Sequence, residues 1–231
     1  MKDERDRSSS DREWLINQIA HALRNPIFAA SVQTESLLLK AGDPAAVTRT
    51  AEALRGQLDR LARSIDEMLL YGRPIRGSAA TVNVAELLGS LTSSYRSGSR
   101  EAPAEVTVGE VDPSLEGRWD RAAVQVILER LVDNAVQHTP PPHAVRLSAG
   151  LTPAGEIELG VADDGDGISP ELLDRVTLPF FPQHSGRPGL GLAIADKFAR
   201  FLGGRLEIES RPREGTLVRC ILPQSFDHAG A

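Results

Sequence analysis

The 231-residue sequence has one cysteine, no long apolar run and no excess of basic residues. The single cysteine, Cys220, excludes an internal disulfide, and its apolar neighbours in LVRCILP favour a buried, reduced thiol. No stretch of about eighteen apolar residues occurs, so we expect neither a signal peptide nor a membrane span. A formal charge of −6 does not favour nucleic-acid binding, which needs a basic surface. These absences predict a cytoplasmic protein without a nucleic-acid partner.

The overall composition is that of a chain with a packed core. Hydrophobic residues make up 41% and charged residues 25%, which excludes wholesale disorder. The length allows one large or two modest domains. We expect a disordered tail over 1–10, a helical domain over 11–73, a mixed domain over 82–223 and a second tail over 224–231.

The helical domain begins with a capping-box pattern, in which Ser10 and Glu13 can satisfy amides at a helix start. Apolar residues then recur at spacings of three and four, which indicates one buried stripe. They are Ile16, Ile19, Leu23, Ile27, Ala30, Leu37 and Leu38. Pro26 lies inside this pattern and should bend the helix or remove one backbone hydrogen bond.

A second helix follows the AGDP break at 41–44. Asp43 is placed to be the N-cap and Pro44 the first helical residue. A heptad then runs to the break at Gly72 and Pro74. Its members are Val47, Thr50, Leu54, Leu58, Leu61, Ile65 and Met68.

Two helices alone cannot cover both apolar stripes, whereas two copies of the hairpin can form a four-helix bundle. We therefore expect a homodimer. The alternative is a hairpin that packs against the rest of its own chain, and periodicity does not separate the two.

The mixed domain follows the Gly- and Pro-containing connector at 72–81. Helical patterns occupy 83–95, 120–138 and 198–202, and strand patterns occupy 105–111, 143–151, 155–163, 203–210 and 215–223. The fold class is therefore α+β: a helical hairpin that forms a dimeric four-helix bundle, followed by an α/β sandwich.

Three segments of the mixed domain predict a nucleotide pocket. LVDNAVQHT at 131–139 places Asn134 in an apolar helix, ADDGDGIS at 162–169 ends a strand at Asp163, and PGLGLAIA at 188–195 opens a helix with glycines. In this order they resemble the N, G1 and G2 boxes of the gyrase, chaperone, kinase and mismatch-repair ATPase superfamily. HALRNPI at 21–27 is similar to the phosphoacceptor box of sensor histidine kinases, so the resemblance spans nearly the whole chain.

His21 lies between the stripe residues Ile19 and Leu23, so its imidazole should point away from the apolar seam. A lone helical histidine is most often a solvated side chain. The resemblance instead implies that His21 accepts the γ-phosphoryl group of ATP and that Asn25, one turn later, positions water or a partner aspartyl-phosphate. The implied partner is the receiver domain of a response regulator.

The resemblance also implies an ATP site. Asn134 would bind Mg²⁺, and Asp163 would accept the exocyclic amine of adenine. Asp163 ends a strand face whose other members are apolar, so the carboxylate should lie at the edge of a dry surface. Other implied ATP-binding residues are His138, Gly165, Gly167, Phe180, Arg187, Gly189 and Gly191. Plain turns and core packing are the alternatives for the glycines and for Phe180.

Three positions depart from the family pattern. Ala22 stands where an acidic residue usually follows the histidine, so the usual partner of the imidazole is missing. Arg130 replaces an asparagine, and Gln137 replaces a phosphate-binding basic residue.

The sequence therefore predicts an ATP- and Mg²⁺-dependent protein-histidine kinase of a two-component system, which phosphorylates itself at His21 and also has a potential phosphatase role. The first alternative is a histidine phosphotransfer or scaffold protein with weakened kinase activity. A second is an ATPase or serine kinase of the same superfamily.

Overall fold

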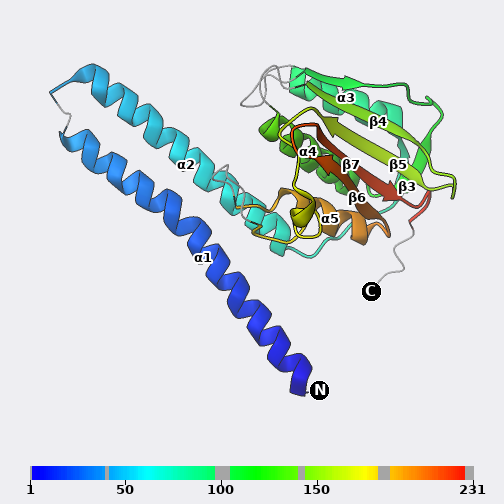
Figure 1. Cartoon of the computed structure of the whole chain (residues 1–231), viewed down its shortest axis with the longest axis horizontal. Coiled ribbons are helices and arrows are strands. Elements are labelled where there is room, and N and C mark those ends of the chain that lie inside the picture. The colour runs from blue at the N-terminus through cyan, green and yellow to red at the C-terminus, as the bar shows by residue number, and fades with distance from the viewer. Residues whose placement is uncertain (1, 40–41, 97–104, 140–143, 182–187, 227–231) are drawn as a thin grey trace. The chain divides into compact units, whose positions relative to one another are not determined.

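A computed structural model describes residues 2–39, 42–96, 105–139, 144–181 and 188–226 (Figure 1). The chain divides into two compact units. One holds the first two helices, and the other holds the remaining helices and all of the strands that are described.

The helical unit is an antiparallel hairpin of α1 (Lys2–Leu39) and α2 (Pro44–Gly72). The prediction for the start of α2 is confirmed. Asp43 Oδ1 accepts hydrogen bonds from the amides of Ala45 (3.0 Å) and Ala46 (3.1 Å), and Pro44 is the first helical residue. Pro44 has no amide hydrogen to lose at this position, so the cap and the proline together fix where α2 begins.

The start of α1 differs from the expectation. The helix begins at Lys2, so residues 2–10 are helical rather than a disordered tail. The helix continues upstream of the capping box at Ser10, where neither glycine nor proline interrupts residues 2–10. The helix also passes through Pro26 without ending.

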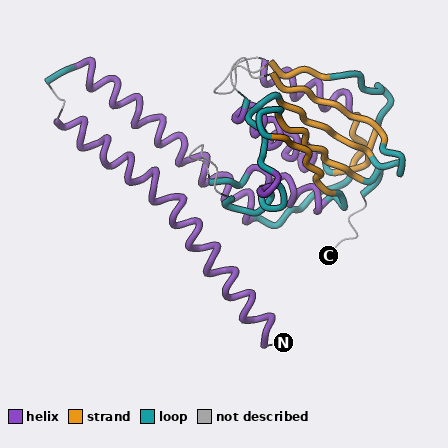
Figure 2. Tube along the Cα trace, viewed as in Figure 1, coloured by secondary structure: helices purple, strands orange, loops and turns teal. Residues whose placement is uncertain are grey.

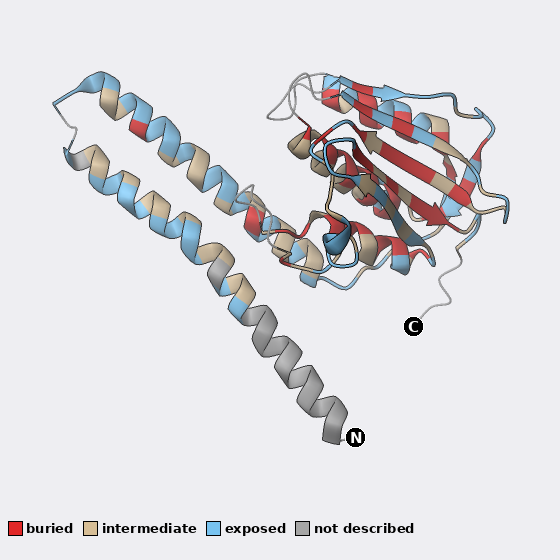
Figure 3. Ribbon diagram, viewed as in Figure 1, coloured by how far each residue is buried: buried red, intermediate tan, exposed pale blue. Residues whose placement is uncertain are grey.

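The hairpin leaves much of its apolar surface uncovered (Figure 3). Phe28 is 70% exposed, and Leu58 is 51% exposed although it belongs to the α2 heptad. Other exposed members of the hairpin are Ile27, Val32, Leu39, Ile65 and Leu69. Apolar residues that stay exposed at helical spacing leave a face on which another surface can pack.

The mixed unit is built on a five-stranded sheet (Figure 2). Its strand order is β2-β4-β5-β7-β6, with β2 parallel to β4 and the remaining neighbours antiparallel. The strands are β2 (Glu105–Val108), β4 (Ala144–Leu151), β5 (Ile157–Asp163), β6 (Arg205–Arg211) and β7 (Gly215–Leu222). A separate antiparallel pair joins β1 (Ala80–Asn83) to β3 (Glu116–Trp119).

Three helices cover one face of this sheet: α3 (Val84–Arg96), α4 (Arg121–His138) and α5 (Gly191–Phe201). Asp120 is the N-cap of α4 and accepts the Ala123 amide at 2.7 Å. Fully buried residues of α4 meet buried residues of the central strands (Figure 3). They include Ile127, Leu128, Leu147, Leu159 and Leu222.

The predicted fold class of this unit is confirmed, down to the pairing of β4 with β5 across the turn closed by the Gly155 amide and the Thr152 carbonyl (2.9 Å). The strands β1 and β3 were not predicted. The thiol of Cys220 is buried, as expected, and burial raises its pKa to about 12. None of the described helices is long and apolar enough to cross a membrane.

Candidate functional site

The candidate site centres on Asp163, the last residue of β5. Its side chain is 9% exposed and lies on the same sheet face as Ile157, Leu159 and Val161, as the alternation predicted. Burial raises the pKa of Asp163 above its ordinary value of 3.8, and hydrogen bonds from the amides of Gly165 and Thr216 oppose that shift. The Gly165 amide lies 2.9 Å from Asp163 Oδ1. A buried carboxylate at the end of a strand is a strong acceptor for a ligand that carries N–H donors.

Thr216 is a residue of this site that the sequence analysis missed. It is the register partner of Asp163 on the neighbouring strand β7, and its side chain is buried. Its position directly after Gly215, at the start of the strand pattern that became β7, is the feature of the sequence that could have pointed to it. Gly215 has a positive φ of 92°, and a Cβ there would lie 1.9 Å from the Asp163 carbonyl oxygen.

The loop after β5 lies close to two other backbone segments, and there is no room for a side chain at either of its glycines, Gly165 and Gly167. A Cβ on Gly165 would lie 2.2 Å from the His138 carbonyl oxygen at the end of α4. A Cβ on Gly167, whose φ is 66°, would lie 1.9 Å from the Arg211 carbonyl oxygen. These contacts give both glycines a structural reason, in addition to the proposed approach to a base.

The same loop joins His138 to the site. The Asp166 amide donates to the His138 carbonyl (3.1 Å), and the Arg213 amide donates to the Asp166 carbonyl (2.7 Å). The structure therefore brings Asp163, Gly165 and the end of α4 together. Asp164 and Asp166 are exposed, as predicted for solvated loop charges.

Asn134 lies one turn before His138 on α4 and is half-buried. Gln137, in the next turn, has a buried Nε2 atom that makes no hydrogen bond with the described residues. A buried donor without a partner is costly, so Gln137 is suited to an acceptor oxygen from a ligand. Within the described residues, no group of three or more His, Cys, Asp or Glu side chains forms a metal site.

Arg130 is held beside an acidic side chain. Its guanidinium lies 3.9 Å from Asp133 Oδ2, and the Tyr95 hydroxyl donates to Asp133 Oδ1 at 2.7 Å. This arrangement moderates the charge that Arg130 brings to the helix turn that carries Asn134.

The start of α5 has the geometry expected of a phosphate-binding turn. Gly189 has a φ of 67°, and Leu190, the N-cap of α5, supplies no side-chain hydrogen bond to the first turn. Apart from its chain neighbours and the backbone of its own helix, no described atom lies within 4 Å of the place that a Cβ on Gly191 would occupy. The amides at this helix start are thus available to an anion. Arg187 lies outside the described residues.

Phe180 has a positive φ of 58°, which is uncommon for a bulky residue, and its ring is buried. The neighbouring Phe181 ring lies 5.7 Å from the Arg175 guanidinium carbon. A positive φ at a buried aromatic residue is maintained only where the packing around it holds the backbone in place, so the packing of Phe180 determines the local chain conformation.

The segment HALRNPI, which is predicted to be a phosphoacceptor box, lies within α1. His21 and Asn25 are one helical turn apart, and Asn25 is exposed. The side chain of His21 lies outside the described residues.

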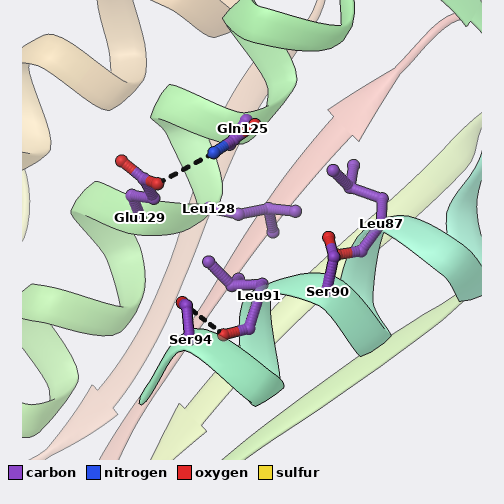
Figure 4. A pocket seen from close by; sticks show the side chains of 7 residues that line it. All are labelled: Leu87, Ser90, Leu91, Ser94, Gln125, Leu128 and Glu129. Atoms are coloured by element: carbon purple, nitrogen blue, oxygen red, sulfur yellow. Dashed lines mark hydrogen bonds between the residues drawn. The ribbon is translucent and has the colours of Figure 1, made fainter. Parts of the chain in front are cut away.

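A separate pocket of about 450 Å³ opens between α3 and α4 (Figure 4). It is lined by Leu87, Ser90, Leu91, Ser94, Gln125, Leu128 and Glu129. Its polar groups bond to one another or to their own helix: Ser90 to the Leu87 carbonyl, Ser94 to the Leu91 carbonyl, and Gln125 to Glu129. Because no predicted nucleotide-binding residue lines this pocket, we place the site at Asp163.

Comparisons with known proteins show which families the chain is similar to. Residues 119–225 match the family of histidine kinase-, DNA gyrase B- and HSP90-like ATPases. The sensor-like histidine kinase SenX3 of Mycobacterium tuberculosis (strain ATCC 25618 / H37Rv) is 28% identical over 94% of this chain and 55% of its own length. The sensor protein DivL of Caulobacter vibrioides is 30% identical over 91% of this chain and 28% of its own length.

The fold is also that of solved proteins. The histidine kinase ThkA, in a crystal structure with the response regulator protein TrrA, aligns over 96% of this chain and 66% of its own with a TM-score of 0.78 and 22% identity. The chain spans 55–60% of the length of its SenX3 relatives.

Proposed function

Because the chain is a histidine kinase catalytic core, a helical hairpin followed by an ATPase domain, we propose that it transfers the γ-phosphoryl group of ATP to His21 and then to an aspartate of a response regulator. The proposal that ATP binds here rests on the buried Asp163 carboxylate at the end of β5, flanked by the amides of Gly165 and Thr216. The proposal that His21 is the acceptor rests on the segment HALRNPI within α1.

In the proposed reaction a ring nitrogen of His21 forms a bond to the γ-phosphorus while the bond to the bridging oxygen breaks and ADP leaves. The proton on the other ring nitrogen passes to a base. Ala22, next in the chain, has no group that accepts it, so water or a carboxylate from elsewhere must do so. The receiver aspartate then attacks the phosphohistidine phosphorus, and the histidine leaves.

The residues present fit a nucleotide with a divalent cation. The Asn134 side-chain oxygen is a suitable ligand for Mg²⁺, which would draw its other ligands from phosphate oxygens and water. Mg²⁺ supplies charge neutralisation at the phosphates when bound. The unpaired Nε2 of Gln137 donates to a phosphate oxygen, although it lacks the charge of a lysine. The first amides of α5, with Gly189 and Gly191, cradle another.

The exposed apolar residues of the hairpin support a homodimer. Two hairpins that bury Ile27, Leu58 and Ile65 against each other form the four-helix bundle expected from the sequence. The proposed protein partners are therefore a second copy of this chain and a receiver domain, and the proposed location is the cytoplasm.

The test is incubation of the chain with γ-labelled ATP and Mg²⁺, followed by acid and base treatment of the labelled protein. We expect a label that acid removes and base does not, and its loss in both His21→Gln and Asp163→Ala. His21→Gln should keep ATP binding by calorimetry, whereas Asp163→Ala should not.

The departures at Ala22 and Gln137 favour one second candidate, a phosphotransfer or scaffold protein. In that case wild type binds ATP weakly and gains no label from it, but accepts phosphate from another phosphorylated protein. A label that resists acid would contradict both candidates and indicate a serine kinase or related ATPase.

A further inference from the structure

Three polar side chains form a row across adjacent strands at one end of the sheet. Asp163 in β5 is the register partner of Thr216 in β7, and Thr216 is the register partner of Ser210 in β6. Residues directly opposite each other in paired strands share a face of the sheet, so the three side chains lie together. Ser210 was not predicted to have any role.

The hydrogen bonds of Ser210 determine the direction of its bond to Thr216. Ser210 Oγ accepts the Ile168 amide at 2.7 Å, donates to the Gly215 carbonyl at 2.9 Å, and lies 2.9 Å from Thr216 Oγ1. A serine hydroxyl has one proton and two lone pairs. Because the proton is used on Gly215, the Thr216 hydroxyl must donate to Ser210, and Thr216 Oγ1 keeps only lone pairs for another molecule.

The edge of the site is then made of acceptors. Asp163 presents a carboxylate whose Oδ1 already receives the Gly165 amide, and Thr216 presents a hydroxyl without a free proton. Such an edge favours a ligand that brings N–H donors and disfavours one that brings a carbonyl oxygen, since two facing acceptors leave buried lone pairs unsatisfied.

We propose that Ser210 is a specificity-determining positioning residue: it holds the Thr216 hydroxyl as an acceptor, and so adds to the preference for a purine nucleotide with an amino group at position 6 over one that lacks it. This inference rests on the proposed ATP binding at Asp163. Ser210 also fixes the glycine loop through Ile168, which places Asp163 and the loop in one hydrogen-bonded unit. It acts through Thr216 rather than by contact with the nucleotide.

The test compares the dissociation constants of ATP and purine riboside 5′-triphosphate, measured by calorimetry with the full chain. The second nucleotide lacks the 6-amino group and, like ATP, has no hydrogen on N1, so wild type should bind ATP more tightly. In Ser210→Ala the Thr216 hydroxyl is released to donate, so ATP should lose affinity relative to purine riboside triphosphate, with the ratio falling about 3- to 10-fold, the size of one hydrogen bond. Ser210→Thr keeps the oxygen and should keep the ratio. Ser148→Ala, at an exposed position of β4, is the matched control.

Two further variants show whether Ser210 acts through Thr216. Thr216→Val removes the hydroxyl at nearly constant volume and should lower the same ratio, and the double variant should lower it no further. Thr216→Val also provides the test if Ser210→Ala does not fold.

Equal losses of affinity for ATP and for purine riboside triphosphate in Ser210→Ala and Thr216→Val would assign both residues a purely structural role and overturn the proposal. An unchanged ratio would overturn it as well, while leaving ATP binding intact. Failure of wild type to bind any nucleotide would overturn the proposed function itself, and this inference with it.

Discussion

The two units of the chain differ in how they cover their apolar residues. The mixed unit buries Trp119, Ile127 and Leu159 completely, whereas the helical unit leaves Phe28 and Leu58 more than half exposed. A core that closes on itself needs no partner, whereas an exposed apolar stripe at helical spacing leaves a face for another surface to cover. The mixed unit is therefore self-contained, and the proposed homodimer supplies the surface that the hairpin lacks.

The first prediction tests whether a second hairpin completes the assembly, and it has the largest expected effect. Leu58→Lys combined with Leu61→Lys places charges in the apolar seam, at a cost of several kcal/mol. We expect a micromolar dimer to dissociate, as measured by analytical ultracentrifugation, with ATP affinity unchanged.

Ala53→Lys is the control, because Ala53 is exposed and lies outside the heptad. It should leave the dimer intact. A wild-type chain that already sediments as a monomer at micromolar concentration would contradict the proposed homodimer, since something other than a second hairpin would then have to cover the apolar residues.

The second prediction separates glycines required by the mixed unit from those kept for a ligand. Gly167→Ala places a Cβ against the Arg211 carbonyl at a positive φ, and should cost about 2–4 kcal/mol of stability and weaken ATP binding. Gly191→Ala meets no described atom within 4 Å, so it should leave the melting temperature unchanged or higher.

If Gly191 instead serves a phosphate, Gly191→Ala should weaken ATP binding without any loss of stability. A melting temperature that falls equally in both variants would show that both glycines are needed for stability, and would contradict the distinction between them.

The same contrast explains how much was predictable from the sequence. Elements of the mixed unit with clear periodicity, such as α4 and the β4–β5 pair, were predicted because burial on one face leaves a pattern in neighbouring residues. The short strands β1 and β3 were missed, since each has only four residues.

Trp119 shows why β3 leaves no local pattern. It is held by contacts distant in sequence: its Nε1 donates to the Pro223 carbonyl at 2.6 Å, and its ring packs over Gly117. The site follows the same rule. Asp163 was predicted from its strand, but Thr216 and Ser210 join it only through the register of β7 and β6, which no local pattern specifies.

The third prediction concerns Ala22, which follows His21 in α1. Ala22→Glu restores a carboxylate that can orient the imidazole and accept its proton, so the rate of phosphohistidine formation should rise by about tenfold. General-base assistance is typically worth more, but a grafted group lacks its supporting contacts. The measurement is the initial rate of acid-labile label at saturating ATP.

Ala20→Glu, on the other side of His21 and exposed, controls for the added charge and should not change the rate. A rate in Ala22→Glu no higher than wild type would show that another group already supplies the base, or that proton transfer is not limiting.

The last prediction is the smallest and concerns the mixed unit alone. Burial raises the pKa of Asp163 in the folded state above its ordinary value of 3.8. A carboxyl with a raised folded pKa binds more protons folded than unfolded, so the stability it contributes is present at low pH and is lost as the pH rises through the folded pKa. Asp163→Asn cannot ionise, and its amide oxygen can still accept the Gly165 amide. We therefore expect this variant to melt close to wild type near pH 4 and a few degrees above it at pH 7, by differential scanning calorimetry. Asp174→Asn, at an exposed position of the same unit, controls for the loss of one negative charge. A difference between Asp163→Asn and wild type that is the same at both pH values would mean that ionisation of Asp163 does not strain the folded unit, and that its carboxylate is solvated or fully compensated by the amides around it.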